Sequence, residues 1–306
     1  MNQFPNKLYF SVTFPGIPVS VIDAWRGLTC FLQLQGLLPK RFSVSQIAGH
    51  AEKYHTTKKL ALAADEITQL ITKRNLNGFW VNSGNFERCE YLDFSLLHAK
   101  NLGNQSTLTC YIGNKAKAPD DWKDFIEQLL ESSPCIGAWQ WKSYYQSWQT
   151  NSRQRDNSKT TFGPIPPGTK RWTEKSSDGY GPDTEYLDTS LNPGRNKELI
   201  PTIRFYPSAE MWLGPHFWQY AKCSKKEALA ADFFIEKRDT PHYLYLKCWP
   251  EAFTRPDGEQ GRMQQRLWKL FFHEDCEWPP GSGTICDEPM YGPPELMPGY
   301  KAGTDG

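Results

Sequence analysis

Pairs of short apolar segments, each followed by an amphipathic segment, most constrain the fold of this 306-residue chain. Residues 91–97 and 106–112 are rich in aromatic and β-branched residues, and the Asn/Gly-containing stretch between them is typical of a β-hairpin. Residues 233–236 and 243–249 form a similar pair in the second half. Chains that place their strands in hairpins build antiparallel sheets with helices packed on them. We therefore predict an α+β fold with largely antiparallel sheets. The alternative, a doubly wound parallel sheet, requires a regular β–α–β alternation that the sequence lacks.

The amphipathic segments predict helices at comparable places in the two halves. Between Trp122 and Leu130, apolar residues recur at i, i+3, i+4, i+7 and i+8. A second apolar face runs from Met263 to Phe271, and weaker stripes predict helices over residues 20–36 and 57–74. Each half can be written strand, helix, strand, strand, helix. This leaves open a duplicated architecture, although the halves share no convincing residue identity.

Composition divides the chain into four parts. Residues 1–148 and 199–278 are the two α+β halves. Residues 149–198 are rich in Ser, Asn, Pro, Gly and charge, which predicts a long irregular connection. Such stretches are functional or mobile in compact proteins, and a disordered linker is the alternative. The Pro/Gly-rich tail, residues 279–306, is predicted to wrap the surface or fray.

Residues 204–220 join the connection to the second half and carry six aromatic side chains. The stretch begins as a strand, and Ser208 then has the residue type that caps a helix. Gly214 and Pro215 interrupt the following pattern, which predicts two short helical turns. The aromatic residues suit either a core junction or a contact with a ligand or protein.

The charge and the hydropathy of the sequence limit the functions that this chain can have. The chain has 35 basic and 34 acidic residues, so it lacks the basic excess of a nucleic-acid binder. The charge is distributed unevenly along the sequence. Residues 151–175 are basic, whereas the residues after His273 include seven acids and one lysine. The N-terminal sequence does not resemble a signal peptide, and no apolar run is long enough to cross a bilayer. We expect a soluble, cytoplasmic protein with no membrane partner and no direct contact with nucleic acid.

Motifs for catalysis are missing from the sequence. There is no phosphate loop, G-x-G-x-x-G, G-x-S-x-G or H-E-x-x-H, and His50 and His55 are wrongly spaced for one helical face. We therefore expect no catalytic, cofactor or metal site, although a hydrolase with an acidic site remains an alternative. The eight cysteines form no C-x-x-C pair and predict buried free thiols, with Cys276 and Cys286 the one pair considered for a bridge.

Aromatic residues are the positive functional signal, with 12 Trp, 14 Tyr and 17 Phe. Trp25, Trp122 and Trp268 lie on or beside predicted helix faces and suit a core. Residues 139–148 hold more aromatic side chains than one helix face can bury. Tyr and Trp are enriched at binding hot spots. This favours a protein partner or, alternatively, a glycan or peptide ligand.

The strand Leu8–Phe14, the helix around Trp25 and the junction Phe205–Glu210 resemble in layout the immunity protein 52 family of polymorphic toxin systems. Members of that family neutralise a restriction-endonuclease-like toxin, and one form is the immunity partner of a type VI secretion nuclease effector. The resemblance implies a cytoplasmic α+β protein that binds a toxin and catalyses nothing. Residues 149–198 and the tail have no counterpart in it.

A nuclease presents a basic cleft to its substrate, so its inhibitor should offer acids around an apolar anchor. The helix over residues 120–131 carries acids and leads into the aromatic segment 139–148. The acidic tail is a second choice, but it would lose more entropy on binding. Alternatively, the helix acids only face solvent. The predicted partner-binding residues are Asp120, Asp121, Asp124, Glu127, Glu131, Trp139, Trp141, Tyr144, Tyr145 and Trp148.

Overall fold

A computed structural model describes most of the chain from Leu8 to Glu274. The described residues are 8–15, 41–46, 53–56, 76–85, 89–99, 103–112, 121–132, 134–150, 165–174, 179–181, 184–187, 191–200 and 203–274. The helices predicted over 20–36 and 57–74, the pair Cys276 and Cys286, and the tail 279–306 lie outside them.

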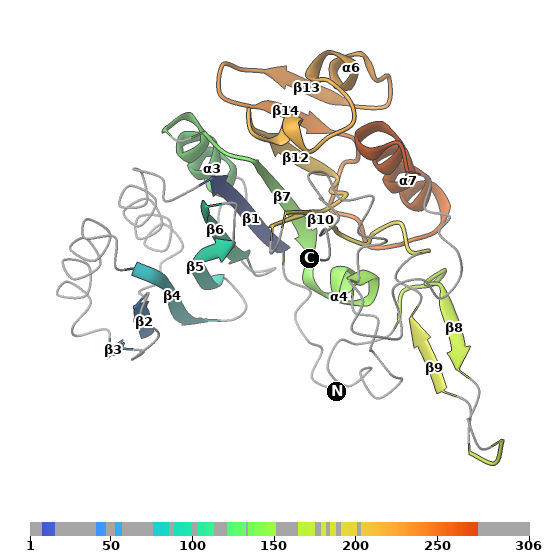
Figure 1. The fold of residues 1–306 in the computed structure, drawn as a ribbon, viewed down its shortest axis with the longest axis horizontal. Helices are drawn as coiled ribbons and strands as arrows, with labels where there is room; N and C mark the ends of the chain where they lie inside the picture. The colour runs from blue at the N-terminus through green and yellow to red at the C-terminus, as the bar shows by residue number, and fades with distance from the viewer. Residues whose placement is uncertain are drawn as a thin grey trace, which may run out of the picture.

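One antiparallel sheet of ten strands runs through the described part of the molecule (Figure 1). From one edge to the other its strands are β13 (Glu236–Asp239), β14 (Leu244–Lys247), β12 (Glu210–Leu213), β7 (Gly137–Lys142), β1 (Leu8–Pro15), β6 (Gly103–Ile112), β5 (Cys89–Ala99), β4 (Leu76–Asn85), β2 (Arg41–Gln46) and β3 (Lys53–Thr56). The sheet joins the two predicted halves, because β7 pairs with β12. The predicted α+β fold with antiparallel strands is confirmed.

The hairpins predicted from the sequence are present, with one shift. Strands β5 and β6 pair across the predicted turn, with Phe94 opposite Leu108. In the second half, β13 begins at Glu236 instead of Phe233. Phe234 packs into the apolar core instead, and the four charged residues that follow it form the exposed edge of the sheet. Charged residues suit a sheet edge because they discourage pairing with another chain.

Four α-helices are described: α3 (Asp121–Ser132), α4 (Ser143–Thr150), α6 (Lys225–Ala230) and α7 (Gly258–Phe272). Helices α3 and α7 confirm the two strongest amphipathic predictions. Helix α7 is followed by His273, whose left-handed backbone (φ 55°) turns the chain so that the N–H of Glu274 donates to the carbonyl of Trp268 at 3.5 Å. Such an ending satisfies carbonyl groups that the last turn would leave unpaired.

Helices α3 and α7 lie on opposite faces of the sheet. Side chains alternate along a strand, so neighbouring residues of β12 point to different faces. Trp212 donates its indole N–H to Glu127 of α3 at 3.0 Å. Met211 and Leu213 belong to the apolar cluster that includes Phe271 of α7. The sheet thus separates a polar layer under α3 from an apolar layer under α7.

The junction at residues 204–220 corrects the prediction of two helical turns. Glu210–Leu213 is strand β12, paired with β7 on one side and β14 on the other. Ser208 caps no helix, since its hydroxyl donates to the carbonyl of Tyr206 at 3.1 Å. Only η3 (Phe217–Gln219), a 3₁₀ turn, is helical. Pairing on both sides of a central strand outweighs the local turn preference that the sequence suggested.

Residues 149–198 are more regular than predicted. They contain β8 (Arg171–Glu174) and β9 (Thr184–Leu187), which form a separate two-stranded sheet. They also contain the start of another hairpin, in which β10 (Lys197–Ile200) pairs with β11 (Ile203–Phe205). These segments are strands within the connection, and its division from the two halves stays a prediction.

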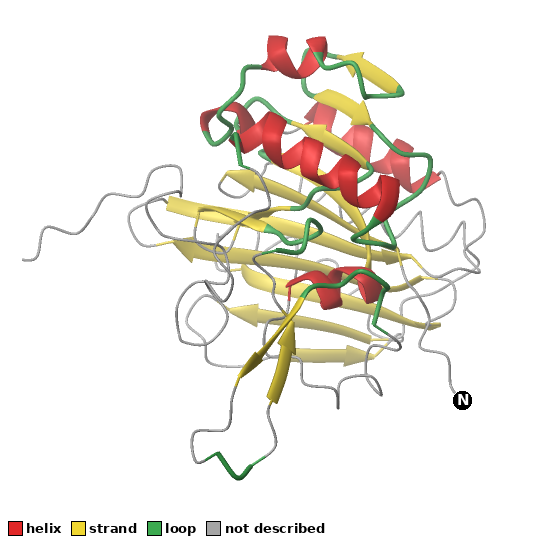
Figure 2. Cartoon of the chain, turned by 90° about the vertical axis from the view of Figure 1, so that its right-hand side faces the viewer, coloured by secondary structure: helices red, strands yellow, loops and turns green. Residues whose placement is uncertain are grey.

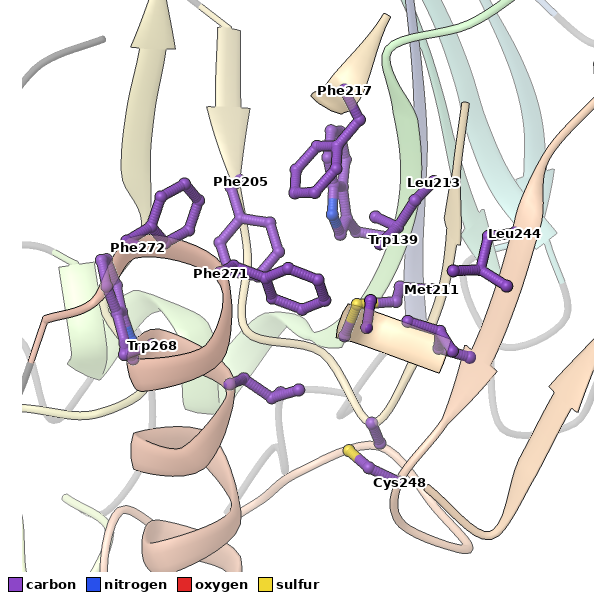
Figure 3. Packing of buried hydrophobic residues seen from close by; sticks show 14 of the residues in the cluster. Trp139, Phe205, Met211, Leu213, Phe217, Leu244, Cys248, Trp268, Phe271 and Phe272 are labelled. Carbon is purple, nitrogen blue, oxygen red and sulfur yellow. The ribbon is translucent and has the colours of Figure 1, made fainter. Parts of the chain in front are cut away.

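Phe205 is the centre of the apolar layer (Figure 3). Its side chain is fully buried, and its ring lies 5.1–6.3 Å, centroid to centroid, from five other aromatic rings. These rings belong to Trp139, Phe217, Trp268, Phe271 and Phe272. One side chain therefore joins β11, β7, η3 and α7.

Three cysteines in the described part confirm the prediction of buried free thiols: Cys135, Cys223 and Cys248. Burial raises the pKa of the Cys135 thiol to about 12. Among the helices described, none combines the length and the apolar character needed to cross a membrane.

We predict that Phe205→Ala lowers the free energy of unfolding by about 3–5 kcal/mol, because it empties the centre of five ring contacts. Urea unfolding followed by tryptophan fluorescence would measure it. Ile235→Ala is the control, since that side chain is 62% exposed and its removal should change stability by about 0.5 kcal/mol or less. Equal losses in the two variants would contradict the central role of Phe205.

Candidate binding surface on helix α3

Helix α3 presents a polar stripe to solvent. Ile126, Leu129 and Leu130 are buried, as the amphipathic pattern predicts. Asp124 and Glu131 are exposed, and their spacing of seven places them on the same side of the helix, with Gln128 between them. Of the other predicted acids on this helix, Asp120 and the side chain of Asp121 lie outside the described residues. The exposed acids of the described helix surface are thus Asp124 and Glu131.

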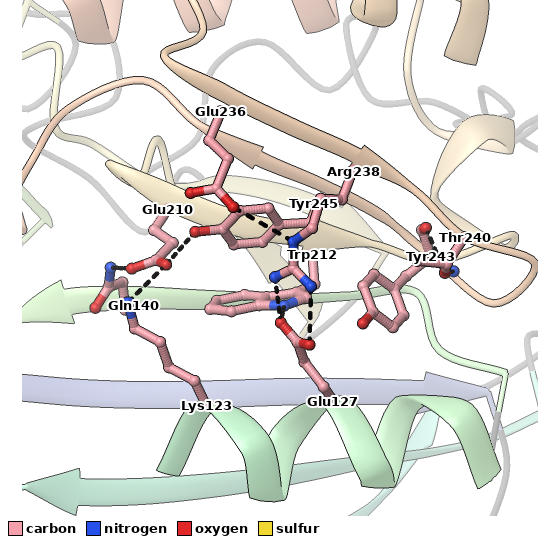
Figure 4. A network of polar contacts seen from close by, with 10 residues as sticks. All are labelled: Lys123, Glu127, Gln140, Glu210, Trp212, Glu236, Arg238, Thr240, Tyr243 and Tyr245. Carbon is pink, nitrogen blue, oxygen red and sulfur yellow. Dashed lines mark hydrogen bonds and ion pairs between the residues drawn. The ribbon is translucent and has the colours of Figure 1, made fainter. Parts of the chain in front are cut away.

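Glu127, also predicted as a surface acid, points instead toward the sheet (Figure 4). Its carboxylate accepts two hydrogen bonds from the guanidinium of Arg238 on β13, at 2.6 and 3.1 Å. It also accepts the indole N–H of Trp212. The guanidinium carbon lies 4.3 Å from the ring centroid of Tyr245, a cation–π arrangement. Glu127 therefore fastens α3 to the sheet and is not available as a free surface acid.

A second ion pair fastens the same helix at its first turn. The carboxylate of Glu210, which is only 2% exposed, accepts a hydrogen bond from Lys123 at 2.9 Å and another from Gln140 at 2.5 Å. The hydroxyl of Tyr245 donates to it as well. These donors come from α3, β7 and β14. A buried carboxylate is tolerated only with such partners, because its desolvation is otherwise costly.

The ion pairs shift the pKa values of the groups around them. Burial by itself raises the pKa of Glu127, but hydrogen bonds from Arg238 and Trp212 outweigh it, and the pKa lies below the ordinary glutamate value. Burial raises the pKa of Tyr243 to about 12, and the charge of Glu127 adds to this. Burial and the hydrogen bond to Glu210 raise the pKa of Tyr245 further. Glu127 is thus charged, and Tyr243 and Tyr245 are neutral, near pH 7.

This arrangement is suited to holding a helix in place. In the polar cluster drawn in Figure 4, Arg238 pairs with both Glu127 and Glu236, and Lys123 pairs with Glu210. In the part of the chain that the structure describes, no three His, Cys, Asp or Glu side chains are grouped so that they could hold a metal ion. The polar layer therefore provides a rigid support for the stripe of Asp124, Gln128 and Glu131.

The predicted aromatic anchors do not join this surface. Trp139, Tyr145 and Trp148 are buried, at 2% exposure or less. Trp139 contacts Phe205 in the apolar layer, and the Tyr145 hydroxyl donates to Gln264 of α7 at 2.8 Å. These three side chains offer no surface to a partner, which corrects their assignment as anchors. They are buried because the segment folds back as β7 and α4 and packs against α7.

Trp141 and Tyr144 are partly exposed, but Trp141 lies on the wrong face of the sheet for a joint surface with α3. It stacks on Tyr206, with ring centroids 4.3 Å apart and planes within 13°. Along β7, Gln140 faces Glu210 and α3, so Trp141 points to the other face. The sheet thus separates Trp139 and Trp141 from the helix acids, and the single interface predicted from the sequence does not form.

Several residues of the cluster were not predicted as site residues, notably Lys123, Glu210, Trp212, Arg238 and Tyr245. Glu127 and Arg238 are 111 positions apart in the sequence. A charged strand such as β13 is expected at a solvent-exposed edge, so its sequence does not reveal a partner on α3. Only the tertiary arrangement brings these groups together.

Comparison with known proteins leaves the family open. No family model and no curated protein matches the sequence. Among solved structures, one described as the Pseudomonas aeruginosa T6SS protein PA0821 aligns over 94% of this chain and 79% of its own length. The two chains are 8% identical, with a TM-score of 0.47. A likeness this distant supports no inference about function.

We predict that Glu127→Gln reduces the acid sensitivity of the fold. Because the folded-state pKa of Glu127 is lowered, its charge stabilises the protein above the ordinary glutamate pKa. That contribution is lost as the pH falls through the lowered value. Wild type should therefore lose more unfolding free energy than the variant between about pH 6 and about pH 3.

Urea unfolding at several pH values would measure this difference. Glu131→Gln is the matched control, since it removes an exposed acid from the same helix and should follow the wild-type curve. If the curves of wild type and Glu127→Gln run parallel over the whole acid range, the ion pair with Arg238 does not stabilise the fold as inferred.

Proposed function

We propose that this chain is a non-catalytic immunity protein that binds a cognate secreted toxin, a nuclease, and neutralises it by occlusion. It would act in the cytoplasm of the producing cell, without a cofactor and without touching nucleic acid. The layout shared with the immunity protein 52 family, quoted above at Leu8–Phe14, Trp25 and Phe205–Glu210, supports this proposal. We also propose that this toxin is an effector of a type VI secretion system.

The observation that carries the proposal is the rigid acidic stripe of α3. Asp124 and Glu131 are exposed on a helix that two ion pairs fasten to the sheet. A nuclease cleft that binds phosphates is basic and attracts such acids. Acids on a fixed helix lose little conformational freedom on binding, so more of the interaction energy remains as affinity.

The structure weakens the case for a glycan- or peptide-binding module. That alternative rested on the aromatic content of residues 139–148. Trp139, Tyr145 and Trp148 fill the core, so their presence is explained by packing. The toxin-binding proposal does not depend on them.

Co-expression tests the proposal directly. An immunity gene should lie beside a toxin gene, so the neighbouring genes would each be expressed in a host cell with and without this chain. We expect one neighbour to arrest growth alone and to be harmless with this chain present, and the purified pair to form a complex. A neighbour that stays toxic in the presence of this chain would refute the proposed function.

For the α3 stripe, we predict that Asp124→Lys/Glu131→Lys slows association with the toxin about tenfold at low ionic strength, because complementary charges steer encounter. The difference should shrink as salt is added. Stopped-flow or biosensor kinetics would measure it. Glu259→Lys is the control, an exposed glutamate on α7 at the opposite face of the sheet. Because the control reverses one charge and the stripe variant reverses two, a slowing of about threefold in the control would mean that total charge, and not the stripe, governs association.

A further inference from the structure

Three connections between elements meet at one end of the sheet. Leu213, the last residue of β12, pairs with Gly137 at the start of β7 and with Leu244 at the start of β14. The residues before β7, after β12 and before β14 therefore lie at the same end of these strands. Loops that a rigid sheet holds in this way are common places for binding residues.

The connections before β7 and after β12 are fastened to one another. The N–H of Gly214 donates to the carbonyl of Ile136 at 3.0 Å, and the N–H of His216 donates to the carbonyl of Cys135 at 3.3 Å. A Cβ on Gly214 would lie 2.1 Å from that Cys135 oxygen, so glycine is needed for this close approach. The turn that leads into η3 is therefore held firmly in place.

The third connection is the turn between β13 and β14, which Thr240 closes. Its N–H and its hydroxyl donate to the carbonyl of Tyr243 at 3.0 and 2.8 Å, and its hydroxyl oxygen accepts the N–H of His242 at 3.2 Å. This turn lies beside α3 (Figure 4). Burial is the main cause of the raised pKa of Tyr243, and the charges of Glu127 and Glu131 add to it. The last turn of α3, with the exposed Glu131, is thus close to this end of the sheet.

Trp218 is an aromatic side chain that η3 presents near these connections. It is half-buried, and its ring packs edge-on against Phe217, with the centroids 5.3 Å apart and the planes at 83°. Phe217 is fully buried in the apolar layer beneath α7, the long helix that Figure 2 shows in front of the sheet. The apolar layer therefore holds one side of the Trp218 ring while the rest remains accessible. An aromatic ring held in this way loses little conformational freedom on binding.

Exposed prolines accompany the tryptophan, one in each of the three connections. Proline fixes its own backbone φ, so a loop that contains it loses less freedom when a partner orders it. Gln219, beside Trp218, is exposed as well. The sheet-end surface, as we call it, consists of Pro134, Pro215, Trp218, Gln219 and Pro241.

We propose that the sheet-end surface is a second part of the toxin interface, in which Trp218 contacts cations at the rim of the basic substrate cleft. The proposal rests on the proposed function above and adds the aromatic anchor that residues 139–148 do not supply. The face of a tryptophan ring attracts Arg and Lys side chains, and a cleft that binds phosphates contains them. The surface adjoins the α3 stripe at Glu131, so one basic cleft can meet the acids and the ring together.

The probe is the purified toxin encoded beside this gene, identified by the co-expression test. We expect Trp218→Ala to weaken its binding about 30-fold, mainly through faster dissociation, as for a central aromatic anchor. The variant also loses the packing on Phe217, so its thermal unfolding is compared with that of wild type. Affinities and rates are then measured below both transitions, by calorimetry and with a biosensor.

Gln219→Arg tests the same surface without changing the apolar layer, because the side chain is exposed. The added cation would face the basic cleft, so binding should weaken about tenfold, and the loss should shrink as salt is added. Gln265→Arg is the matched control, the same substitution at an exposed position in the middle of α7. It should stay within about twofold of wild type, since charges beyond the screening length interact weakly.

Wild-type affinity in a folded Trp218→Ala, or in Gln219→Arg, would overturn the inference and leave the proposed function standing. Equal losses in Gln219→Arg and Gln265→Arg would also overturn it, because the position of the added charge would then not matter. If Trp218→Ala does not fold, the two glutamine variants decide. If wild type itself does not bind the toxin, the inference and the proposed function are both overturned.

Discussion

The carboxylate of Glu210 is the interaction on which the polar side of the structure depends. It lies on β12, the third strand from one edge of the sheet, and is 2% exposed, so an unpaired charge there would cost several kcal/mol. Lys123, Gln140 and Tyr245 satisfy it from a helix and two neighbouring strands. The position of α3 is therefore coupled to the strand order β14-β12-β7. Without this order, the acid would have no adequate set of donors.

Because side chains alternate along β12 and β7, the two faces of the sheet form two layers that are held together by different kinds of interaction. Beneath α3, directional ion pairs and hydrogen bonds accompany the buried side chains of Ile126, Leu129 and Leu130. Beneath α7 the contacts are aromatic and apolar, and Phe205 holds them together by shape. A partner can use the outer side of α3 without disturbing the apolar layer, because the sheet lies between them. This separation suits a protein that binds through its surface while its core stays unchanged.

Local signals in the sequence were enough to predict the fold class, helices α3 and α7, and the β5–β6 hairpin. These elements have strong periodic patterns that tertiary contacts reinforce. The strand β12 was read as helical turns, because its pairing with β7 and β14 cannot be seen from residues 208–214 alone. Strands β8 and β9 were not predicted for a similar reason, since each has only four residues and lies in a polar stretch of the sequence.

The candidate site was predicted less well than the fold. Asp124 and Glu131 are exposed as expected, whereas Glu127 is drawn inward by Arg238, a partner 111 positions away. The aromatic residues near position 139 were counted as surface because one helix face could not bury them. They are distributed instead over a strand and a helix that both face α7. Burial of this kind depends on long-range packing, which a single sequence does not reveal.

The charge order of β13 has a consequence for how copies of this chain meet. Its residues Glu236, Lys237, Arg238 and Asp239 read acid, base, base, acid along an exposed edge. If a second copy added its own β13 antiparallel in full overlap, Glu236 would oppose Asp239 and Lys237 would oppose Arg238. Like charges directly opposite one another destabilise a strand pair. The order of charges along β13 is the same in both directions. It therefore disfavours antiparallel pairing between the β13 strands of two copies, which would otherwise extend the sheet into a dimer.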